Sequence, residues 1–280
     1  MSVQRTIYAT YLQNCLYQDR PFALAPNSTL NAKLNIHKDV DVPPGITPRL
    51  LYYAIGNGGH SMSVGGNGLA ISVPKVHRAT DAALYGQIPF VLREENDDLS
   101  NLEQGQYALR RSESHGGTTY WAYYLKRLDF SATVPTMKYS INDAGVITTN
   151  EFEPTNDNLN PTPPVLLADG SNPTEAEYVH VEALTTVQFT QNDRDELLEV
   201  ARILYGDEKY ALISEIALCS GVDRQLSVPA QGGGTQSFNE SVAVQVNHYV
   251  QLFRQLEYDN RGFDVTLNLG GTDPMVVEQT

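Results

Sequence analysis

The sequence predicts an α+β, β-rich fold: antiparallel sheets in a sandwich-like core, with an N-terminal helix and one helix near residues 193–205. The main observation is that apolar and polar residues alternate through residues 241–258. The same alternation recurs in residues 211–219 and 263–269. Side chains point to opposite faces of a strand with a period of two, so this spacing predicts long strands with one buried face.

These three alternating segments are expected to form one antiparallel unit, with turns at residues 221–234 and 259–262. His248 falls on the predicted inward face of the long strand, where we expect a hydrogen-bonded core histidine. The six histidines lie far apart and lack the paired spacing of a zinc site.

Two helices are predicted near the N-terminus. Residues 2–19 carry apolar side chains at three- and four-residue spacing, and Pro21 ends this amphipathic pattern. A short helix is expected at residues 27–34, with Asn27 or Ser28 as its cap.

The helix at residues 193–205 has the clearest boundaries in the chain. Thr190 supplies the capping side chain before it, and Gly206 follows its last apolar residue. One or two helical turns are also expected at residues 78–86.

Shorter apolar runs bounded by turn residues predict the remaining strands. These runs are residues 49–55, 88–93, 107–111, 119–130, 137–141, 146–152 and 179–189. Residues 154–173 are rich in proline and poor in apolar side chains, which is typical of a loop, an arm or a hinge. We therefore expect an N-terminal helix plus β-rich portion at residues 1–165 and an α+β portion at residues 166–280, or one continuous domain.

Composition limits the classes of function. The 280-residue chain has a formal net charge of −14, which argues against a surface built to bind nucleic acid or anionic lipid. Cys15 and Cys219 are too few for a disulfide framework, so we expect two free, buried thiols and assembly in a reducing cytoplasm. No apolar run is long enough to span a membrane, and no hydrophobic signal core is expected at the N-terminus.

The catalytic motifs in the chain are incomplete. The glycine-rich residues 56–68 lack the Gly-Lys-Ser/Thr ending of a phosphate loop. Residues 59–63 only echo a nucleophile elbow, so a hydrolase acting through Ser61 ranks last and a flexible polar turn is expected. The acidic residues 94–101 lack the spacing of a calcium loop. We expect no catalytic residue, metal or cofactor, and we do not expect an enzyme.

The most aromatic stretch contains Tyr120, Trp121, Tyr123 and Tyr124. Aromatic side chains are enriched at interface cores but also fill ordinary β-sheet cores. We expect most of this stretch to be core.

Two short motifs resemble the N-terminal attachment domain of phage tail-collar fibre proteins. They are YAIGNGG at residues 53–59 and ISEIAL at residues 213–218, the second followed by the long alternating strand. Five longer runs are similar to virion structural proteins of tailed phages: PNSTLNAKL, YYAIGNGGH, HRATDAALYGQIPFVLRE, YLKRLDF and ILYGDEKYALISEIALCSGVDR. The resemblance to such virion proteins would extend over nearly the whole chain. The chain departs from the fibre family because no repetitive shaft follows the attachment-like motifs, which favours a stand-alone adaptor.

The resemblance implies a structural subunit of a bacteriophage tail, a baseplate or fibre-attachment adaptor that is assembled in the host cytoplasm and located in the virion. Its implied partners are other tail or baseplate proteins and further copies of itself in trimer- or hexamer-related numbers. The contacts would use exposed strand edges and arms. The alternative is a carbohydrate- or receptor-binding module that uses an aromatic patch around Trp121. The expected interface residues are Tyr120, Trp121, Tyr123, Tyr124, Asn57, His60, Asn160, Pro161 and Pro163.

Overall fold

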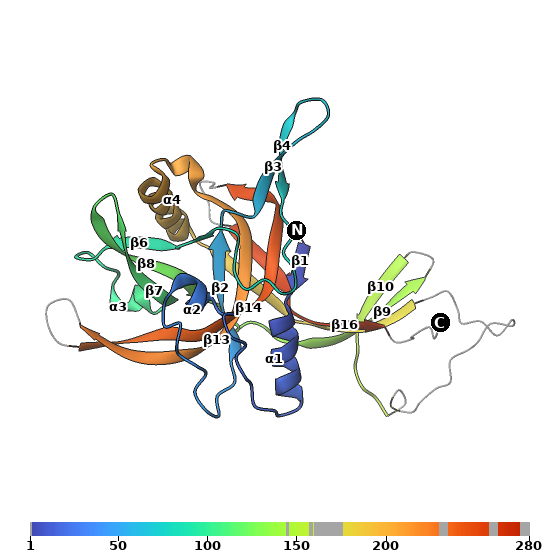
Figure 1. Cartoon of the computed structure of the whole chain (residues 1–280). Helices are drawn as coiled ribbons and strands as arrows, with labels where there is room; N and C mark the ends of the chain where they lie inside the picture. Colours follow the sequence, from blue (N-terminus) through green and yellow to red (C-terminus); the bar gives the residue numbers. More distant parts are fainter. Residues whose placement is uncertain are drawn as a thin grey trace. The chain divides into compact units, whose positions relative to one another are not determined.

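The computed structural model of the chain describes residues 2–143, 146–156, 159, 176–229, 235–257 and 263–274 (Figure 1). It divides into two units: unit 1 is Met1–Leu128 with Phe189–Phe263, and unit 2 is Asp129–Gln188 with Asp264–Thr280. This division differs from the expected boundary near residue 165. Unit 2 is built from two separate stretches of chain that pair with each other, and a composition shift along the sequence does not reveal such pairing.

Unit 1 contains an eight-stranded sheet with the order β1-β14-β13-β2-β8-β6, in which β5 pairs with β2 and β7 pairs with β8. The registers of all these pairs are antiparallel. The α+β, β-rich fold class is therefore confirmed. The strands are β1 (Ser2–Arg5), β2 (Arg49–Gly56), β5 (Gln87–Ile88), β6 (Val91–Glu94), β7 (Tyr107–His115), β8 (Thr118–Arg127), β13 (Leu212–Pro229) and β14 (Thr235–Glu257).

The N-terminal helix is shorter than its apolar pattern predicts. β1 pairs with β14, and α1 (Ile7–Tyr17) begins after Thr6, whose hydroxyl accepts from the backbone N–H of Ala9. The first residues are therefore a strand, because the edge of the sheet offers them hydrogen-bond partners that a sequence pattern cannot show.

Two of the other predicted helices form. The cap of α2 (Leu30–Leu34) is Thr29 and neither Asn27 nor Ser28, since the Thr29 hydroxyl accepts from Ala32. α4 (Gln191–Tyr205) has the expected cap, because Thr190 and Asp193 form a reciprocal capping box, and Gly206 ends it.

Residues 78–86 were expected to be helical, but they form turns. Ser100 caps α3 (Asn101–Gln104), and η1 (Glu208–Tyr210) follows α4.

The hairpin of β13 and β14 runs further than its sequence pattern predicts. Residues 222–229 remain paired with residues 235–242, so most of the predicted turn is strand. Register shifts interrupt the pairing, one of them between Leu218 and Cys219, and they move Tyr249 into the core beside Val244 and Val246. The strict alternation that we expected across the whole of β14 is therefore wrong beyond Val246.

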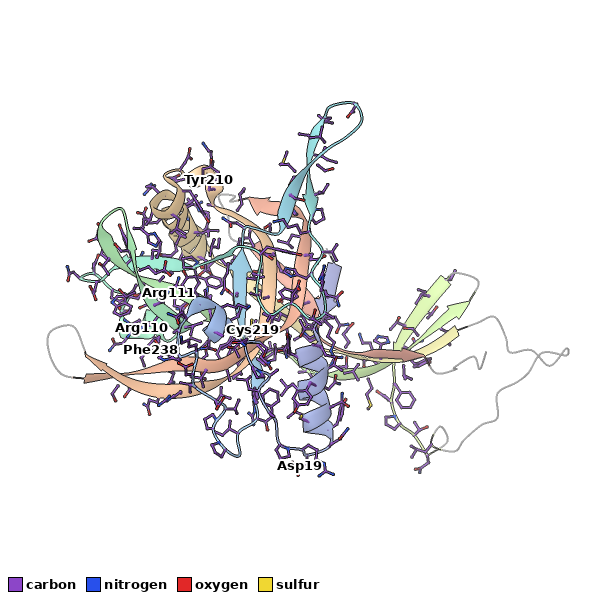
Figure 2. The ribbon with its side chains drawn as sticks, viewed as in Figure 1. Asp19, Arg110, Arg111, Tyr210, Cys219 and Phe238 are labelled. Atoms are coloured by element: carbon purple, nitrogen blue, oxygen red, sulfur yellow. The ribbon has the colours of Figure 1, made fainter. Side chains whose placement is uncertain are left out.

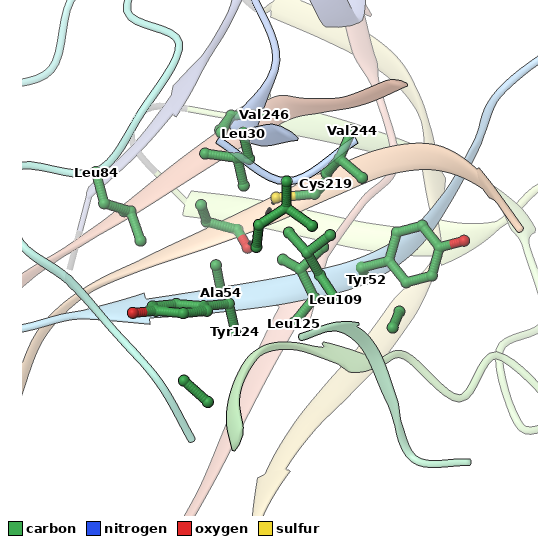
Figure 3. Packing of buried hydrophobic residues seen from close by; sticks show 14 of the residues in the cluster. Leu30, Tyr52, Ala54, Leu84, Leu109, Tyr124, Leu125, Cys219, Val244 and Val246 are labelled. Atoms are coloured by element: carbon green, nitrogen blue, oxygen red, sulfur yellow. Dashed lines mark hydrogen bonds between the residues drawn. The ribbon is translucent and has the colours of Figure 1, made fainter. Parts of the chain in front are cut away.

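The core of unit 1 lies where α2, α4 and the loop that contains Leu84 meet the sheet (Figure 3). It includes Leu30, Tyr52, Ala54, Leu84, Leu109, Tyr124, Leu125, Val200, Cys219, Val244, Val246 and Tyr249. Cys15 and Cys219 are both free and buried, as expected. Burial raises the pKa of the Cys219 thiol well above its ordinary value, so this side chain acts as a small apolar group.

Unit 2 holds a four-stranded sheet with the order β10-β9-β11-β16 and a two-stranded sheet of β12 and β15. Because β15 pairs with β12, the expected addition of this segment to the β13–β14 hairpin is wrong. The strands are β9 (Thr136–Asp143), β10 (Val146–Glu151), β11 (Ala176–Glu182), β12 (Leu184–Phe189), β15 (Phe263–Asn268) and β16 (Thr272–Pro274).

In the described part of the chain, the helices are all too short or too polar to cross a membrane.

Candidate functional site

The glycine-rich segment after β2 forms a β-hairpin and not the flexible turn that we expected. β3 (His60–Val64) pairs with β4 (Ala70–Pro74), and the two make a separate two-stranded sheet that projects from unit 1 (Figure 1). We call residues 60–74 the ribbon. The turn at its tip uses Gly68, whose φ of 77° suits a glycine.

The ribbon exposes apolar side chains on both of its faces. The register pairs Met62 with Ser72 and Val64 with Ala70, while Ile71 pairs with Ser63 on the opposite face. The exposed fractions are 68 % for Met62, 67 % for Val64, 60 % for Leu69 and 49 % for Ile71. The ribbon contains no Asp, Glu, Lys or Arg. Natural sheet edges usually carry charges that prevent association, so a ribbon of this kind is typical of a contact surface.

The base of the ribbon is held by backbone hydrogen bonds. Lys75 N–H donates to the Gly59 carbonyl at 2.7 Å, and the Gly59 N–H donates to the Ser214 hydroxyl at 2.8 Å. His60 Nε2 lies 2.6 Å from the Leu252 carbonyl, to which it donates. The ribbon is thereby attached to both β13 and β14.

A buried carboxylate lies directly below this base. Glu215 is 1 % exposed, and its two oxygens accept from the Gly86 N–H at 2.9 Å, the Tyr85 N–H at 3.2 Å and His77 Nε2 at 2.8 Å. Because the carboxylate has three donors, its burial is compensated.

His77 completes this cluster. Its ring stacks on the Tyr249 ring, with a centroid distance of 3.7 Å and an interplanar angle of 5°, and Nδ1 lies 3.2 Å from an Asp81 carboxylate oxygen. Both ring nitrogens of His77 therefore face carboxylates. We call His77, Tyr85, Ser214, Glu215 and Tyr249 the anchor. Neighbouring backbone carbonyls complete its hydrogen bonds, because the hydroxyls of Tyr85, Tyr249 and Ser214 donate to Val76, Ala83 and Gly56, respectively. Such satisfied polar groups are typical of a structural cluster.

A second uncharged surface is the outer side of α1. We call its exposed residues Ile7, Thr10, Tyr11, Asn14 and Tyr17 the N-terminal face; Ile7 is 52 % exposed, Tyr11 44 % and Tyr17 79 %. The helix contains no charged residue at all. A solvated helix usually carries charges on its outer face, so the N-terminal face is typical of a surface that a partner covers.

α4 shows the ordinary alternative within the same unit. Asp193 binds Lys126 at 2.5 Å, and Arg202 pairs with Glu199 and Glu208. The chain therefore solvates one surface helix with ion pairs and leaves α1 without any.

The ribbon and the N-terminal face attach to the same part of β14. β1 pairs with it from Gln251 to His248, and the Thr6 N–H donates to the Asn247 carbonyl at 2.9 Å. His60 of the ribbon binds the carbonyl of Leu252. Both surfaces thus belong to the β1 edge of the eight-stranded sheet.

The predicted aromatic patch is mostly internal. Trp121 is half-buried, and the Arg110 guanidinium lies 4.7 Å from its ring centroid and 4.5 Å from that of Phe238 (Figure 2). Asp98 and Glu240 form ion pairs with the same guanidinium. Arg110 occupies a position over the indole where a sugar ring would stack, so the geometry does not favour the carbohydrate alternative.

Tyr123 and Tyr124 are buried, which corrects their expected role as interface residues and agrees with the expectation that most of this stretch is core. Tyr123 donates to Asp98 at 2.6 Å, and Tyr124 donates to Glu113. Burial, followed by these hydrogen bonds, raises the pKa of both phenols above the ordinary range. Tyr120 is half-buried.

The remaining predicted contact residues divide into two groups. The Asn57 amide donates to the Tyr205 hydroxyl at 2.9 Å, and His60 is held by β14, so both side chains have internal partners. Asn160, Pro161 and Pro163 lie outside the described residues, as does most of the arm at 154–173.

Asn57 and His60 were the predicted contact residues of the glycine-rich segment, whereas its most exposed apolar residues, Met62, Val64 and Leu69, were not predicted. The available signal was the uncharged run of residues 50–74, in which alternating apolar residues flank Gly65, Gly66 and Gly68.

No other kind of site competes with these surfaces in the described part of the chain. Ser61 is exposed within β3 opposite Val73, and this regular strand position is not a nucleophile elbow. Among the described residues, no group of three or more His, Cys, Asp or Glu side chains could hold a metal ion.

Comparison with known proteins identifies a family without assigning an activity. A family of unknown function, DUF7208, matches residues 1–280, so the chain belongs to this family. No curated protein and no solved structure matches the chain significantly.

Proposed function

We propose that this member of DUF7208 is a structural subunit of a bacteriophage tail, a baseplate or fibre-attachment adaptor that works by protein–protein assembly. The observation that carries the proposal is the ribbon, an uncharged β-hairpin that exposes Met62, Val64, Leu69 and Ile71. Such a projecting element contributes little to the stability of its own unit. Covered by a partner, each of these side chains would be removed from water, and its burial would favour association.

The anchor supports the same function. A projecting contact element transmits position only if its base is rigid, and here the base is tied to β13 through Ser214 and to β14 through the Leu252 carbonyl. The base of the ribbon therefore does not have to become ordered when a partner binds, which lowers the entropic cost of assembly.

The resemblance to tailed-phage virion proteins gives the proposal its biological setting. The similar runs include YYAIGNGGH, which leads into the ribbon, and ISEIAL, which contributes Ser214 and Glu215 to the anchor. The motifs on which the resemblance depends are thus the ones that build and hold the projecting element.

Quantitative mass spectrometry of intact particles tests this function. Particles would be purified from cells in which the chain is expressed from the genome that encodes it, and then washed at high salt. Isotope-labelled peptides of this chain would serve to quantify its amount in the particles. A copy number per particle that is a multiple of three or six is expected. Absence from intact particles, or an amount well below one copy in each, would overturn the proposal.

A further inference from the structure

The ribbon and the N-terminal face are two separate charge-free surfaces on a strongly acidic chain. The formal net charge is −14, while residues 6–18 and residues 50–74 contain no Asp, Glu, Lys or Arg. When two copies approach, their acidic surfaces repel each other, and contacts between uncharged surfaces avoid adding like charges at the interface. The absence of charge therefore favours these two exposed apolar surfaces for contacts between identical copies.

We propose that the ribbon of one copy packs on the N-terminal face of a second copy of this chain. The inference rests on the proposed assembly function and names one of its partners. A basic partner would be attracted to the acidic surface elsewhere on the chain. The ribbon and the N-terminal face carry no charge, so they offer such a partner no electrostatic attraction.

The chemistry of the two surfaces is complementary. The ribbon offers aliphatic side chains such as Met62 and Val64, with exposed serine hydroxyls at positions 61, 63 and 72 between them. The N-terminal face offers Tyr11 and Tyr17, whose rings can cover the aliphatic groups while their hydroxyls hydrogen-bond to the serines. Aromatic residues with a polar tip are enriched in contacts of this kind.

The contact joins two different surfaces and is therefore heterologous. In a heterologous contact each copy uses one surface for the preceding neighbour and another for the following one, which generates a closed ring when the rotation closes. Rings of three or six copies agree with the proposed tail function.

The first experiment measures mass in solution. Light scattering coupled to size exclusion, over a concentration series, is expected to give a trimer or hexamer for the full chain. Met62→Asp and Tyr11→Asp are each expected to raise the concentration needed for half-assembly about a hundredfold, because each buries an unpaired carboxylate in the contact.

Leu102→Asp is the matched control, since Leu102 of α3 is an exposed apolar residue outside both surfaces. It introduces the same charge and is expected to leave the assembly unchanged. A wild-type chain that is a monomer or a dimer at every concentration would overturn the inference, as would an equal effect of all three substitutions. Circular dichroism of each variant separates lost assembly from lost folding.

Cross-linking tests which surfaces meet. Two variants with one added cysteine each, Met62→Cys and Tyr11→Cys, would be mixed and oxidised; the native Cys15 and Cys219 are buried. A disulfide-linked pair is expected in the mixture and not in either variant alone. Cross-linking of Met62→Cys with itself would show that ribbons meet each other, and would overturn the contact proposed here.

These outcomes can be told apart from a failure of the proposed function. If the chain does not assemble with itself but is present in intact particles at a fixed copy number, the self-contact is wrong and the structural role stands. If the disulfide-linked pair forms but the chain is absent from particles, the self-contact stands and the tail function is wrong.

Discussion

The ribbon and the anchor are neighbours in unit 1 with opposite chemistry. In the anchor, the buried Glu215 accepts three hydrogen bonds and the buried His77 stacks on Tyr249. The ribbon is exposed along most of its length and contains no Asp, Glu, Lys or Arg. This difference predicts separate roles for the two regions. Substitutions in the anchor should affect folding, and substitutions in the ribbon should affect association.

Removing the Glu215 carboxylate should have the largest effect on folding. Glu215→Ala is expected to lower the free energy of unfolding by about 3–5 kcal/mol, because His77 and two backbone N–H groups lose their buried acceptor. Glu215→Gln keeps an acceptor oxygen and should cost less, about 1–3 kcal/mol. Urea unfolding, followed by the fluorescence of the single tryptophan, Trp121, measures both. A loss below about 1 kcal/mol for Glu215→Ala would show that the anchor is not a stability element.

A pair of glycine substitutions makes the same chemical change at Gly58, next to the base of the ribbon, and at Gly66, within the ribbon. A Cβ at Gly58 would lie 2.5 Å from the backbone nitrogen of Gly86, whereas a Cβ at Gly66 in the ribbon meets nothing within 4 Å. Gly58→Ala should therefore cost about 1–3 kcal/mol through overpacking against backbone. Gly66→Ala should change stability by less than about 0.5 kcal/mol. The comparison would fail if urea midpoints showed equal losses.

The third prediction uses pH. Burial, followed by the nearby Arg5 guanidinium, lowers the pKa of His248 in β14 to about 4 from an ordinary value of 6.5. The unfolded chain then binds more protons than the folded chain between these values. The contribution of His248 to the free energy of unfolding is therefore fully present above about pH 6.5. It decreases as the pH falls to about 4, and after allowance for partial exposure the loss is about 2 kcal/mol.

Unfolding measured at several pH values in this window tests the third prediction. His248→Gln should flatten the profile, because it removes the titrating group. Ile71→Ser in the ribbon is the control and should keep the slope of the wild type, since it adds and removes no titratable group. An unchanged slope in His248→Gln would assign the pH dependence to other residues.

Local signals predicted much of the fold. Alternation predicted the strand segments that became β13 and β14, and apolar runs bounded by turn residues predicted those that became β2 and β8. Thr190 and Gly206 were predicted to cap and to end α4, which begins two residues before the expected start at residue 193. These predictions succeeded because the information lies within a few residues of each element.

The candidate site was less predictable, because it depends on pairing between distant residues. His77 and Glu215 are separated by 138 positions, and no spacing rule connects them. Tyr123 and Tyr124 looked like contact residues by composition, but their place in the sheet buries them. The ribbon was read as a turn because its glycines suggested one, while the pairing of β3 with β4 converts the segment into a hairpin.

The sequence by itself determined the β-rich class, the boundaries of α4, the two free thiols and the absence of charge from residues 6–18 and 50–74. Only the tertiary structure decided that the outer side of α1 and the ribbon are exposed within these uncharged segments, that β15 pairs with β12, and that Glu215 hydrogen-bonds to His77. The physical reason is that composition and periodicity are properties of neighbouring residues. Burial and hydrogen-bond satisfaction depend on which distant segments meet, and the folded chain alone settles that.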